Sequence, residues 1–168
     1  MTPRPAVPSD AEAIAAIYNE GIVERIATFE TRPRRADEIS SWLGTPYPVI
    51  AVEEDGLVIG FAASSAYRPA RECYSGVAEF SVYVARPARR RGAGSLAMKA
   101  LIASAESAGI WKLLSRVFVE NHASLELLRG LDFREVGVYR RHARLDGEWR
   151  DVMIVERLLG ARRPSSPS

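Results

Sequence analysis

Cysteine, histidine and lysine are scarce in this chain, and long apolar runs are absent. Cys73 is the only cysteine, so no internal disulfide can form, and no Cys and His cluster has the spacing of a zinc site. No run approaches the roughly 18 apolar residues of a membrane span, and no apolar segment follows the basic N-terminus as in a signal peptide. We therefore expect no metal, no membrane partner and a reducing, cytoplasmic location.

A strong charge of one sign is also missing. The net charge is only +2, which does not predict a nucleic-acid partner. Only Lys99 and Lys112 are lysines among 23 basic residues, which reflects either a GC-rich coding sequence or the use of arginine as a fixed fork for anions. The length of 168 residues predicts one domain over residues 1–160, and the Pro- and Ser-rich tail 161–168 is expected to be disordered.

Hydrophobic periodicity predicts alternating strands and helices. Asp55-Gly56 and Asp146-Gly147 are typical of tight hairpin turns, and Ser9 with Glu12 resembles a capping box at a helix start. This order predicts an α/β or α+β fold, a mixed sheet with helices packed on it. The expected strands are 3–7, 47–53, 57–64, 77–85, 111–119, 133–143 and 150–157, and the expected helices are 10–24, 36–43, one after Gly94 that ends at Gly109, and one that Asn121 caps and that runs to about Leu131.

The segment Arg89-Arg90-Arg91-Gly92-Ala93-Gly94-Ser95 lies between a predicted strand and a predicted helix. Gly92 and Gly94 allow the backbone to approach a ligand, and the first N–H groups of the helix have no partner within it. Such a helix start beside three arginines favours a pyrophosphate. A tight turn with a solvated charge run is the alternative, but adjacent arginines repel one another unless an anion compensates.

Three pyrophosphate ligands can be compared. A P-loop needs Gly-x-x-x-x-Gly-Lys, and no such run occurs. The run Gly92 to Ala97 fits a dinucleotide fingerprint with Glu120 further on, but the glycines do not follow the strand directly and the chain leaves little room for a substrate domain. Coenzyme A is the third candidate.

Arg89-Arg90-Arg91-Gly92-Ala93-Gly94 matches the Arg/Gln-x-x-Gly-x-Gly/Ala loop of the GCN5-related N-acetyltransferases, and the chain resembles that family over about residues 3–159. Within it, the chain is most similar to the phosphinothricin, methionine sulfoximine and arsinothricin N-acetyltransferases. The segments that carry this resemblance are 27–30, 67–69, 78–84, 121–124 and 145–152.

The resemblance implies a mixed, mostly antiparallel sheet of six to seven strands, about four flanking helices and a splayed central strand pair. It also implies acetyl-CoA as cosubstrate, with its pantetheine arm paired to the main chain of one splayed strand. Asn121 is either a cofactor contact or a helix cap, and both roles can hold together. The implied cofactor-binding residues are Val82, Tyr83, Val84, Arg89, Arg90, Arg91, Gly92, Ala93, Gly94, Ser95, Asn121 and Ser124.

Glu79 is the candidate general base, because the branch has a carboxylate at this position. Two-residue alternation places Glu79 and Tyr83 on one face of the strand and Phe80 and Val82 on the other. A rim carboxylate paired with Arg68 or Arg71 is the alternative for Glu79. The N–H of Val82 or a neighbour is the candidate oxyanion donor.

The residue expected to protonate the leaving thiolate is missing from its usual place. Many family members have a tyrosine seven residues after the capping Asn, and bacterial phosphinothricin acetyltransferases have a histidine there, but this chain has Leu128. Tyr139 and His142 are other candidate donors, although packing is the alternative role for each. A thiol with a pKa near 8.5 leaves with little assistance.

The resemblance implies a small amino-acid acceptor with a second anionic head, and detoxification as the outcome. Arg68 and Arg71 are candidate forks for its oxyanions, Phe29 and Tyr74 candidate walls, and Thr28 a polar contact. A peptide or protein N-terminus is an alternative acceptor, and a non-catalytic coenzyme A binding module is an alternative function. A homodimer is expected only because relatives often dimerise.

Overall fold

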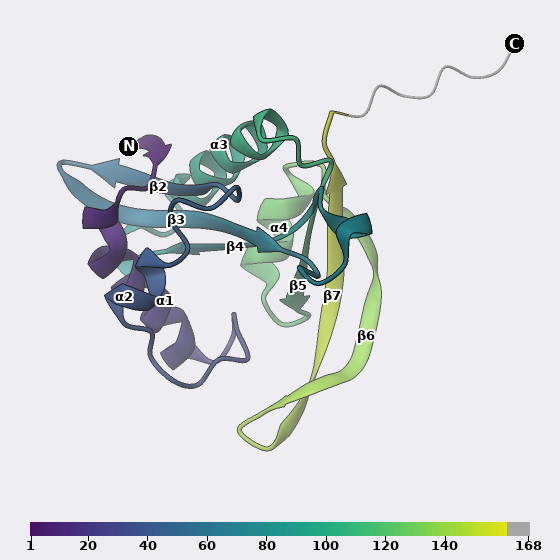
Figure 1. The fold of residues 1–168 in the computed structure, drawn as a ribbon. Coiled ribbons are helices and arrows are strands. Elements are labelled where there is room, and N and C mark those ends of the chain that lie inside the picture. Colours follow the sequence, from purple (N-terminus) through teal and green to yellow (C-terminus); the bar gives the residue numbers. More distant parts are fainter. Residues whose placement is uncertain (161–168) are drawn as a thin grey trace, which may run out of the picture.

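The computed structural model describes residues 1–160, so the expected disorder of the tail 161–168 lies outside the described part. Within those residues one seven-stranded sheet carries four α-helices (Figure 1). The strands are β1 (Thr2–Pro5), β2 (Val49–Glu54), β3 (Leu57–Ala66), β4 (Val77–Val84), β5 (Lys112–Phe118), β6 (Arg134–Leu145) and β7 (Glu148–Leu158), and the helices are α1 (Ala11–Glu24), α2 (Ala36–Ser40), α3 (Ala93–Ser107) and α4 (His122–Arg129).

The strand order is β1-β2-β3-β4-β5-β7-β6, and only β4 and β5 run parallel. Both predicted Asp-Gly turns are confirmed. Asp55 and Gly56 have φ of 50° and 77°, and Asp146 and Gly147 have φ of 50° and 81°, as a two-residue type I′ hairpin requires. The β6–β7 hairpin projects beyond the rest of the sheet (Figure 1).

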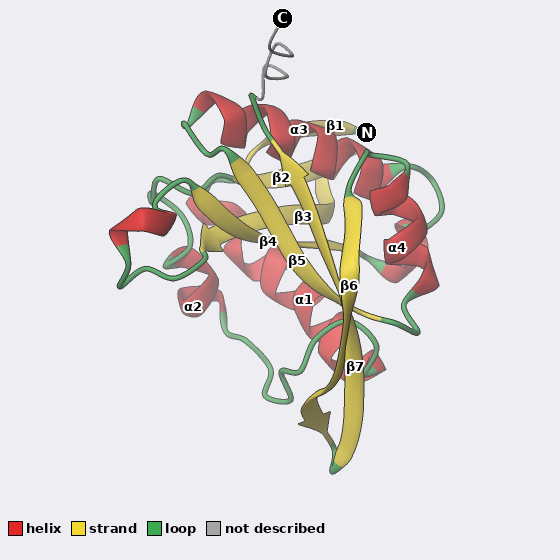
Figure 2. Ribbon diagram, turned by 90° about the vertical axis from the view of Figure 1, so that its right-hand side faces the viewer, coloured by secondary structure: helices red, strands yellow, loops and turns green. Residues whose placement is uncertain are grey.

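Helices cover both faces of the sheet, as the mixed pattern predicts (Figures 1 and 2). In β4, Ala78 and Phe80 belong to the core under α3 and α4, whereas Tyr83 packs against the core under α1 and α2. This confirms the predicted alternation along β4, because successive side chains of a strand point to opposite faces.

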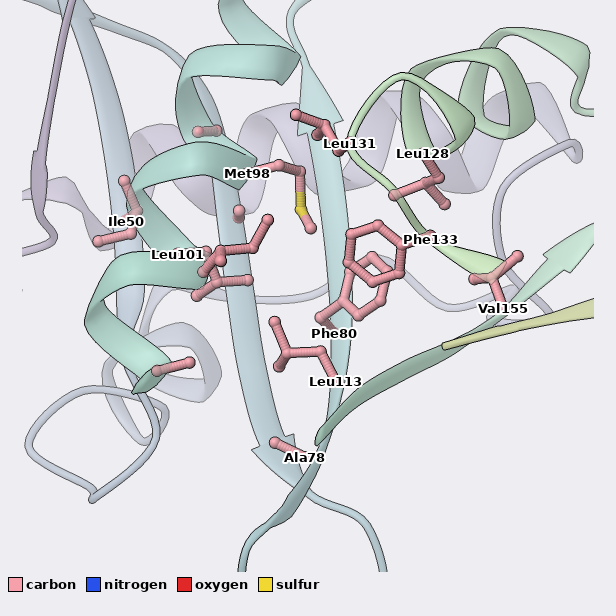
Figure 3. Packing of buried hydrophobic residues seen from close by; sticks show 14 of the residues in the cluster. Ile50, Ala78, Phe80, Met98, Leu101, Leu113, Leu128, Leu131, Phe133 and Val155 are labelled. Carbon is pink, nitrogen blue, oxygen red and sulfur yellow. The ribbon is translucent and has the colours of Figure 1, made fainter. Parts of the chain in front are cut away.

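The larger core anchors β4 at the point from which β5 diverges. The rings of Phe80 and Phe133 lie 4.9 Å apart, and Met98 and Leu101 of α3 are fully buried beside them (Figure 3). Burying each such side chain contributes about 1.5–3 kcal/mol relative to leaving it in water. The middle of β4 is therefore held firmly from the α3 side.

Two local predictions are wrong. Ser9 and Glu12 do not form the capping box. Instead, the carboxylate of Asp10 accepts a hydrogen bond from the N–H of Val7 at 2.8 Å and pairs with Arg4 at 2.7 Å. The second helix ends at Ser40 and not at residue 43, where single turns replace it. Across residues 1–160 no helix combines the length and hydrophobicity of a membrane span.

Candidate active site

The central strands β4 and β5 pair only at their beginnings. Val77 to Glu79 lie opposite Lys112 to Leu114, and the pairing ends there. Beyond this point β5 continues to pair with β7 on its other side. The predicted splay of the central strand pair is therefore present, and the gap opens at Phe80.

Main-chain groups of β4 face this gap. Tyr67 N–H donates to Val77 O and Ala85 N–H donates to Ile59 O, so the odd-numbered residues of β4 bond to β3. The N–H and C=O of Val82 and Val84 consequently point toward β5, which no longer pairs with them. The carbonyl of Val84 accepts a hydrogen bond from Arg89 Nε at 3.0 Å.

A small cavity of about 40 Å³ lies in the gap. Asn121 and Ser124 line it from α4. The Oδ1 atom of Asn121 accepts a hydrogen bond from Ser124 N–H at 3.2 Å, so Asn121 is an N-cap and also faces the gap. The full lining is Ala27, Phe80, Ser81, Val82, Tyr83, Ser115, Arg116, Val117, Asn121, Ser124 and Leu128.

The glycine segment begins α3 beside this gap. Gly92 has φ 92° and accepts the first helical hydrogen bond, from Leu96 N–H. The N–H groups of Ala93, Gly94 and Ser95 precede that bond and therefore point out of the helix start. Gly94 allows close packing, because a Cβ there would lie 3.2 Å from a methyl carbon of Leu127.

Two of the three arginines of the segment have carboxylate partners within the protein, so the expectation that only a bound anion offsets their repulsion is wrong for Arg89 and Arg91. Arg89 pairs with Glu24 at 2.9 Å and Arg91 pairs with Glu54 at 2.9 Å. Desolvation raises the pKa of Glu24, but hydrogen bonds from Arg89 and Arg86 outweigh it and hold that pKa below its usual value. Arg90 is exposed with φ 60°, and it forms no ion pair within residues 1–160.

A larger cavity of about 760 Å³ adjoins the gap on the α1 and α2 side. Four of the site residues predicted from the sequence line this cavity, namely Glu79, Thr28, Phe29 and Tyr83. Burial raises the pKa of the Tyr83 hydroxyl far above its usual value, so this group stays neutral. Its lining is Tyr18, Ala27, Thr28, Phe29, Glu30, Ser41, Trp42, Thr45, Tyr47, Ala63, Ser64, Ser65, Ala66, Glu79, Phe80, Ser81, Tyr83, Ser115, Arg116, Phe118, His142 and Ala143.

Glu79 lines the larger cavity, and the next residue, Phe80, lines both cavities. Its Oε1 accepts a hydrogen bond from Arg116 Nη2 at 2.7 Å. The alternative prediction, that Glu79 pairs with Arg68 or Arg71, is therefore wrong. Glu79 does pair with an arginine, but that arginine is Arg116 of β5.

The loop before β4 contains Arg68, Arg71 and Tyr74, which lie close to one another. The guanidinium of Arg68 lies 5.2 Å from the ring of Tyr67, and that of Arg71 lies 5.9 Å from the ring of Tyr74. None of these residues is in the lining of either cavity. Their role at the acceptor stays a prediction.

The two candidate proton donors for the leaving thiolate, His142 and Tyr139, differ in their position relative to the larger cavity. His142 lines the larger cavity, with its ring 6.4 Å from that of Phe29 and 5.3 Å from that of Tyr139. Tyr139 is exposed on the hairpin. Leu128, at the place where the family resemblance implies a tyrosine or histidine, is buried and lines the gap. Within residues 1–160 no group of three His, Cys, Asp or Glu side chains is arranged to hold a metal.

Arg116 and Ser115 are two further site residues that the sequence pattern did not predict. Both line the two cavities, and Ser115 Oγ donates to the carbonyl of Phe80 at 2.9 Å. A signal for them exists in the sequence, because Ser and Arg interrupt the apolar run from Leu113 to Phe118 in a central strand.

The unpaired main-chain edge of β4 in the gap fits a pantetheine arm. The start of α3 beside it fits the pyrophosphate of coenzyme A, and the adjoining cavity with the carboxylate of Glu79 fits an acyl acceptor. This arrangement defines an acyltransferase that uses acetyl-CoA. The sequence model of the acetyltransferase (GNAT) family matches residues 14–133, and the chain belongs to that family.

Two relatives span almost the whole chain. The phosphinothricin N-acetyltransferase of Streptomyces coelicolor is 34% identical over 163 residues, 93% of this chain and 95% of the relative. The L-methionine sulfoximine/L-methionine sulfone acetyltransferase of Pseudomonas aeruginosa is 30% identical over 158 residues, 91% of each chain.

Two solved structures share the fold closely. A phosphinothricin acetyltransferase from Sinorhizobium meliloti, solved in complex with acetyl-CoA, has a TM-score of 0.88 at 30% identity and covers 99% of this chain and 92% of its own. A ribosomal-protein-alanine N-acetyltransferase from Brucella melitensis has a TM-score of 0.89 at 29% identity, with 95% and 100% covered. The fold, the enzyme class and the acetyl-CoA cosubstrate are thereby confirmed.

Proposed function

We propose that this enzyme acetylates the α-amino group of a small amino-acid analogue of the phosphinothricin or methionine sulfoximine type, by direct transfer from acetyl-CoA. The observation that supports the proposal is the pairing of Glu79 with Arg116, because Glu79 lines the acceptor cavity and Arg116 lines both that cavity and the cofactor gap. The names of the Streptomyces and Pseudomonas relatives support this acceptor class.

Two groups of residues bind acetyl-CoA in this proposal. The main chain of Val82 and Val84, with Asn121 and Ser124, holds the pantetheine arm, and the N–H groups of residues 93–95 hold the pyrophosphate together with the arginines of residues 89–91. Bound acetyl-CoA supplies the activated acyl carbon.

Glu79 accepts the proton of the attacking amine, directly or through a water. The Val82 N–H points into the gap and stabilises the negative charge that develops on the acyl oxygen. Departure of the thiolate needs no dedicated acid, because a thiol with a pKa of about 8.5 leaves with little assistance, so Leu128 is tolerated in place of a tyrosine.

Acetyl-CoA turnover with defined amines tests the proposal. We expect thiol release with at least one of phosphinothricin, arsinothricin and methionine sulfoximine. Absence of turnover with all three removes the acceptor assignment. Binding of acetyl-CoA without transfer to any amine indicates a non-catalytic binding module. Detoxification, a cytoplasmic location and dimerisation stay predictions within this proposal.

A peptide N-terminus is the second candidate acceptor, and the similarity to the Brucella ribosomal-protein-alanine N-acetyltransferase favours it. A peptide acceptor lacks the free α-carboxylate of an amino acid, so the two candidates differ in one charged group next to the reacting amine. The same thiol assay with an alanine-terminated peptide separates them.

A further inference from the structure

Arg116 is a cation in the acceptor cavity with no role assigned so far. Among the described residues that line this cavity it is the only Arg or Lys, and its guanidinium lies 2.7 Å from the carboxylate of Glu79. The two side chains project from β5 and β4 next to the end of the strand pairing. A positive and a negative group thus stand side by side where the reacting amine must lie.

The ion pair between these groups is accessible and weak. The side chain of Arg116 is 44% exposed and that of Glu79 is 26% exposed. Exposed ion pairs contribute about 0–1 kcal/mol to stability. A ligand that offers a better partner to each group can therefore replace the pair at small cost.

An α-amino acid carries such partners on a single carbon, an ammonium group for Glu79 and a carboxylate for the guanidinium fork. We propose that Arg116 binds the α-carboxylate of the acceptor and thereby places its amine at Glu79. This inference rests on the proposed function, and it makes Arg116 a residue that selects free amino acids over peptides.

The other charged groups of the cavity are consistent with this role. Glu30 pairs with Arg34 at 3.0 Å and lies in the loop after α1, and His142 lies on the hairpin beside Phe29. Neither of these supplies a second fixed cation. The loop arginines Arg68 and Arg71 face Tyr67 and Tyr74 and are absent from the lining. Arg116 is thus the group in this cavity best suited to a carboxylate.

The test compares two acceptors that differ only in this charge, L-methionine sulfone and its α-carboxamide. The ratio of kcat/KM for the acid to that for the amide is measured in the wild-type enzyme and in Arg116→Gln. We expect this ratio to fall about 10- to 100-fold in the variant, mainly through a higher KM for the acid, since a charged hydrogen bond is lost.

Effects that do not concern the carboxylate cancel in this comparison. Both acceptors carry the same amine and side chain, so any change at Glu79 and any difference in intrinsic reactivity affect the ratio equally in the two enzymes. Arg116→Lys, which keeps the charge, should restore part of the ratio. Arg134→Gln removes another arginine from an exposed ion pair, with Glu156, and should leave the ratio unchanged.

An unchanged ratio in Arg116→Gln overturns the inference while the proposed function stands. A wild-type enzyme that acetylates an alanine-terminated peptide and neither the acid nor the amide overturns both. The thermal midpoint of each variant, measured by circular dichroism, shows whether it is folded. If Arg116→Gln is unfolded, the ratio is measured in Arg116→Met, which also removes the charge, and a ratio equal to that of the wild type overturns the inference.

Discussion

Ser115 Oγ donates a hydrogen bond to the carbonyl oxygen of Phe80 at 2.9 Å, directly after the last paired residues of β4 and β5. A parallel ladder that continued would supply a main-chain N–H of β5 at this carbonyl. The serine hydroxyl replaces that donor and lets β5 turn away without leaving the half-buried acceptor unsatisfied. Ser115 thus lies at the end of the cofactor gap where the pairing of β4 and β5 stops.

Ser115→Ala should therefore destabilise the protein by about 1–3 kcal/mol, because the carbonyl of Phe80 loses its partner. Chemical denaturation measures this change. Ser115→Thr keeps the hydroxyl and is the matched control, expected to retain most of the stability. A Ser115→Ala protein as stable as the wild type would show that water satisfies the carbonyl equally well.

Glu79→Gln should lower kcat at least about 100-fold, because general base catalysis typically contributes a factor of this size or larger. The dissociation constant for acetyl-CoA, measured by calorimetry, should stay within a few-fold of the wild type. Glu135→Gln changes another half-buried glutamate that is paired with an arginine, Arg129, and should keep kcat. Equal losses in both variants would contradict a base role for Glu79.

Gly92→Ala should destabilise the protein by about 1–2 kcal/mol and weaken acetyl-CoA binding, since an L side chain at φ 92° is strained. A Cβ at Gly92 has open space, so the cost comes from the backbone alone. Gly137→Ala also meets open space and lies outside the left-handed region, which makes it the control. We expect no loss of affinity for acetyl-CoA in Gly137→Ala, and equal behaviour of the two variants would count against this reading.

Asp10→Asn should lower stability near neutral pH by about 1–3 kcal/mol, because the hydrogen bonds to Arg4 and Val7 N–H lose a charged partner. The hydrogen bond from Arg4 holds the pKa of Asp10 below its usual value. A lowered folded-state pKa stabilises the protein fully above the unfolded-state pKa of about 4, and this stabilisation is lost as the pH falls through the folded-state value.

The stability difference between wild type and Asp10→Asn should accordingly be constant from pH 7 to 5 and shrink below about pH 4. Urea denaturation at each pH measures it. Asp37→Asn alters an exposed carboxylate paired with Arg35 and serves as the control. A difference that grows as the pH falls has the wrong sign and would rule out this account of Asp10.

Acceptors with a neutral head should be preferred to acceptors with a second anion. Once Arg116 holds the α-carboxylate, the described lining of the cavity offers hydroxyls such as Thr28 and Tyr83, and no further Arg or Lys. We expect kcat/KM for methionine sulfone to exceed that for phosphinothricin about tenfold or more, since an unpaired anion is costly to desolvate. The reverse order would favour Arg68 and Arg71 as acceptor residues.

Much of the fold was predictable because local patterns and tertiary contacts agree. The Asp-Gly turns and the apolar alternation of β4 adopt the predicted conformations. The prediction of a capping box at Ser9 was wrong for a tertiary reason. The Asp10 carboxylate pairs with Arg4 of β1 and accepts a hydrogen bond from Val7 N–H, and sequence rules for helix starts do not include such contacts.

The sequence alone indicated the enzyme class, because the arginine-glycine loop between a strand and a helix is a continuous segment that resembles the loop of the GCN5-related N-acetyltransferases. Only the tertiary structure decided which charges meet. Glu24 of α1 and Glu54 of β2 neutralise two arginines of the loop before α3. Arg116 of β5 pairs with Glu79 of β4, a neighbouring strand in the sheet that is distant in the sequence. Such pairings depend on strand order and register, and no spacing in the sequence encodes those directly.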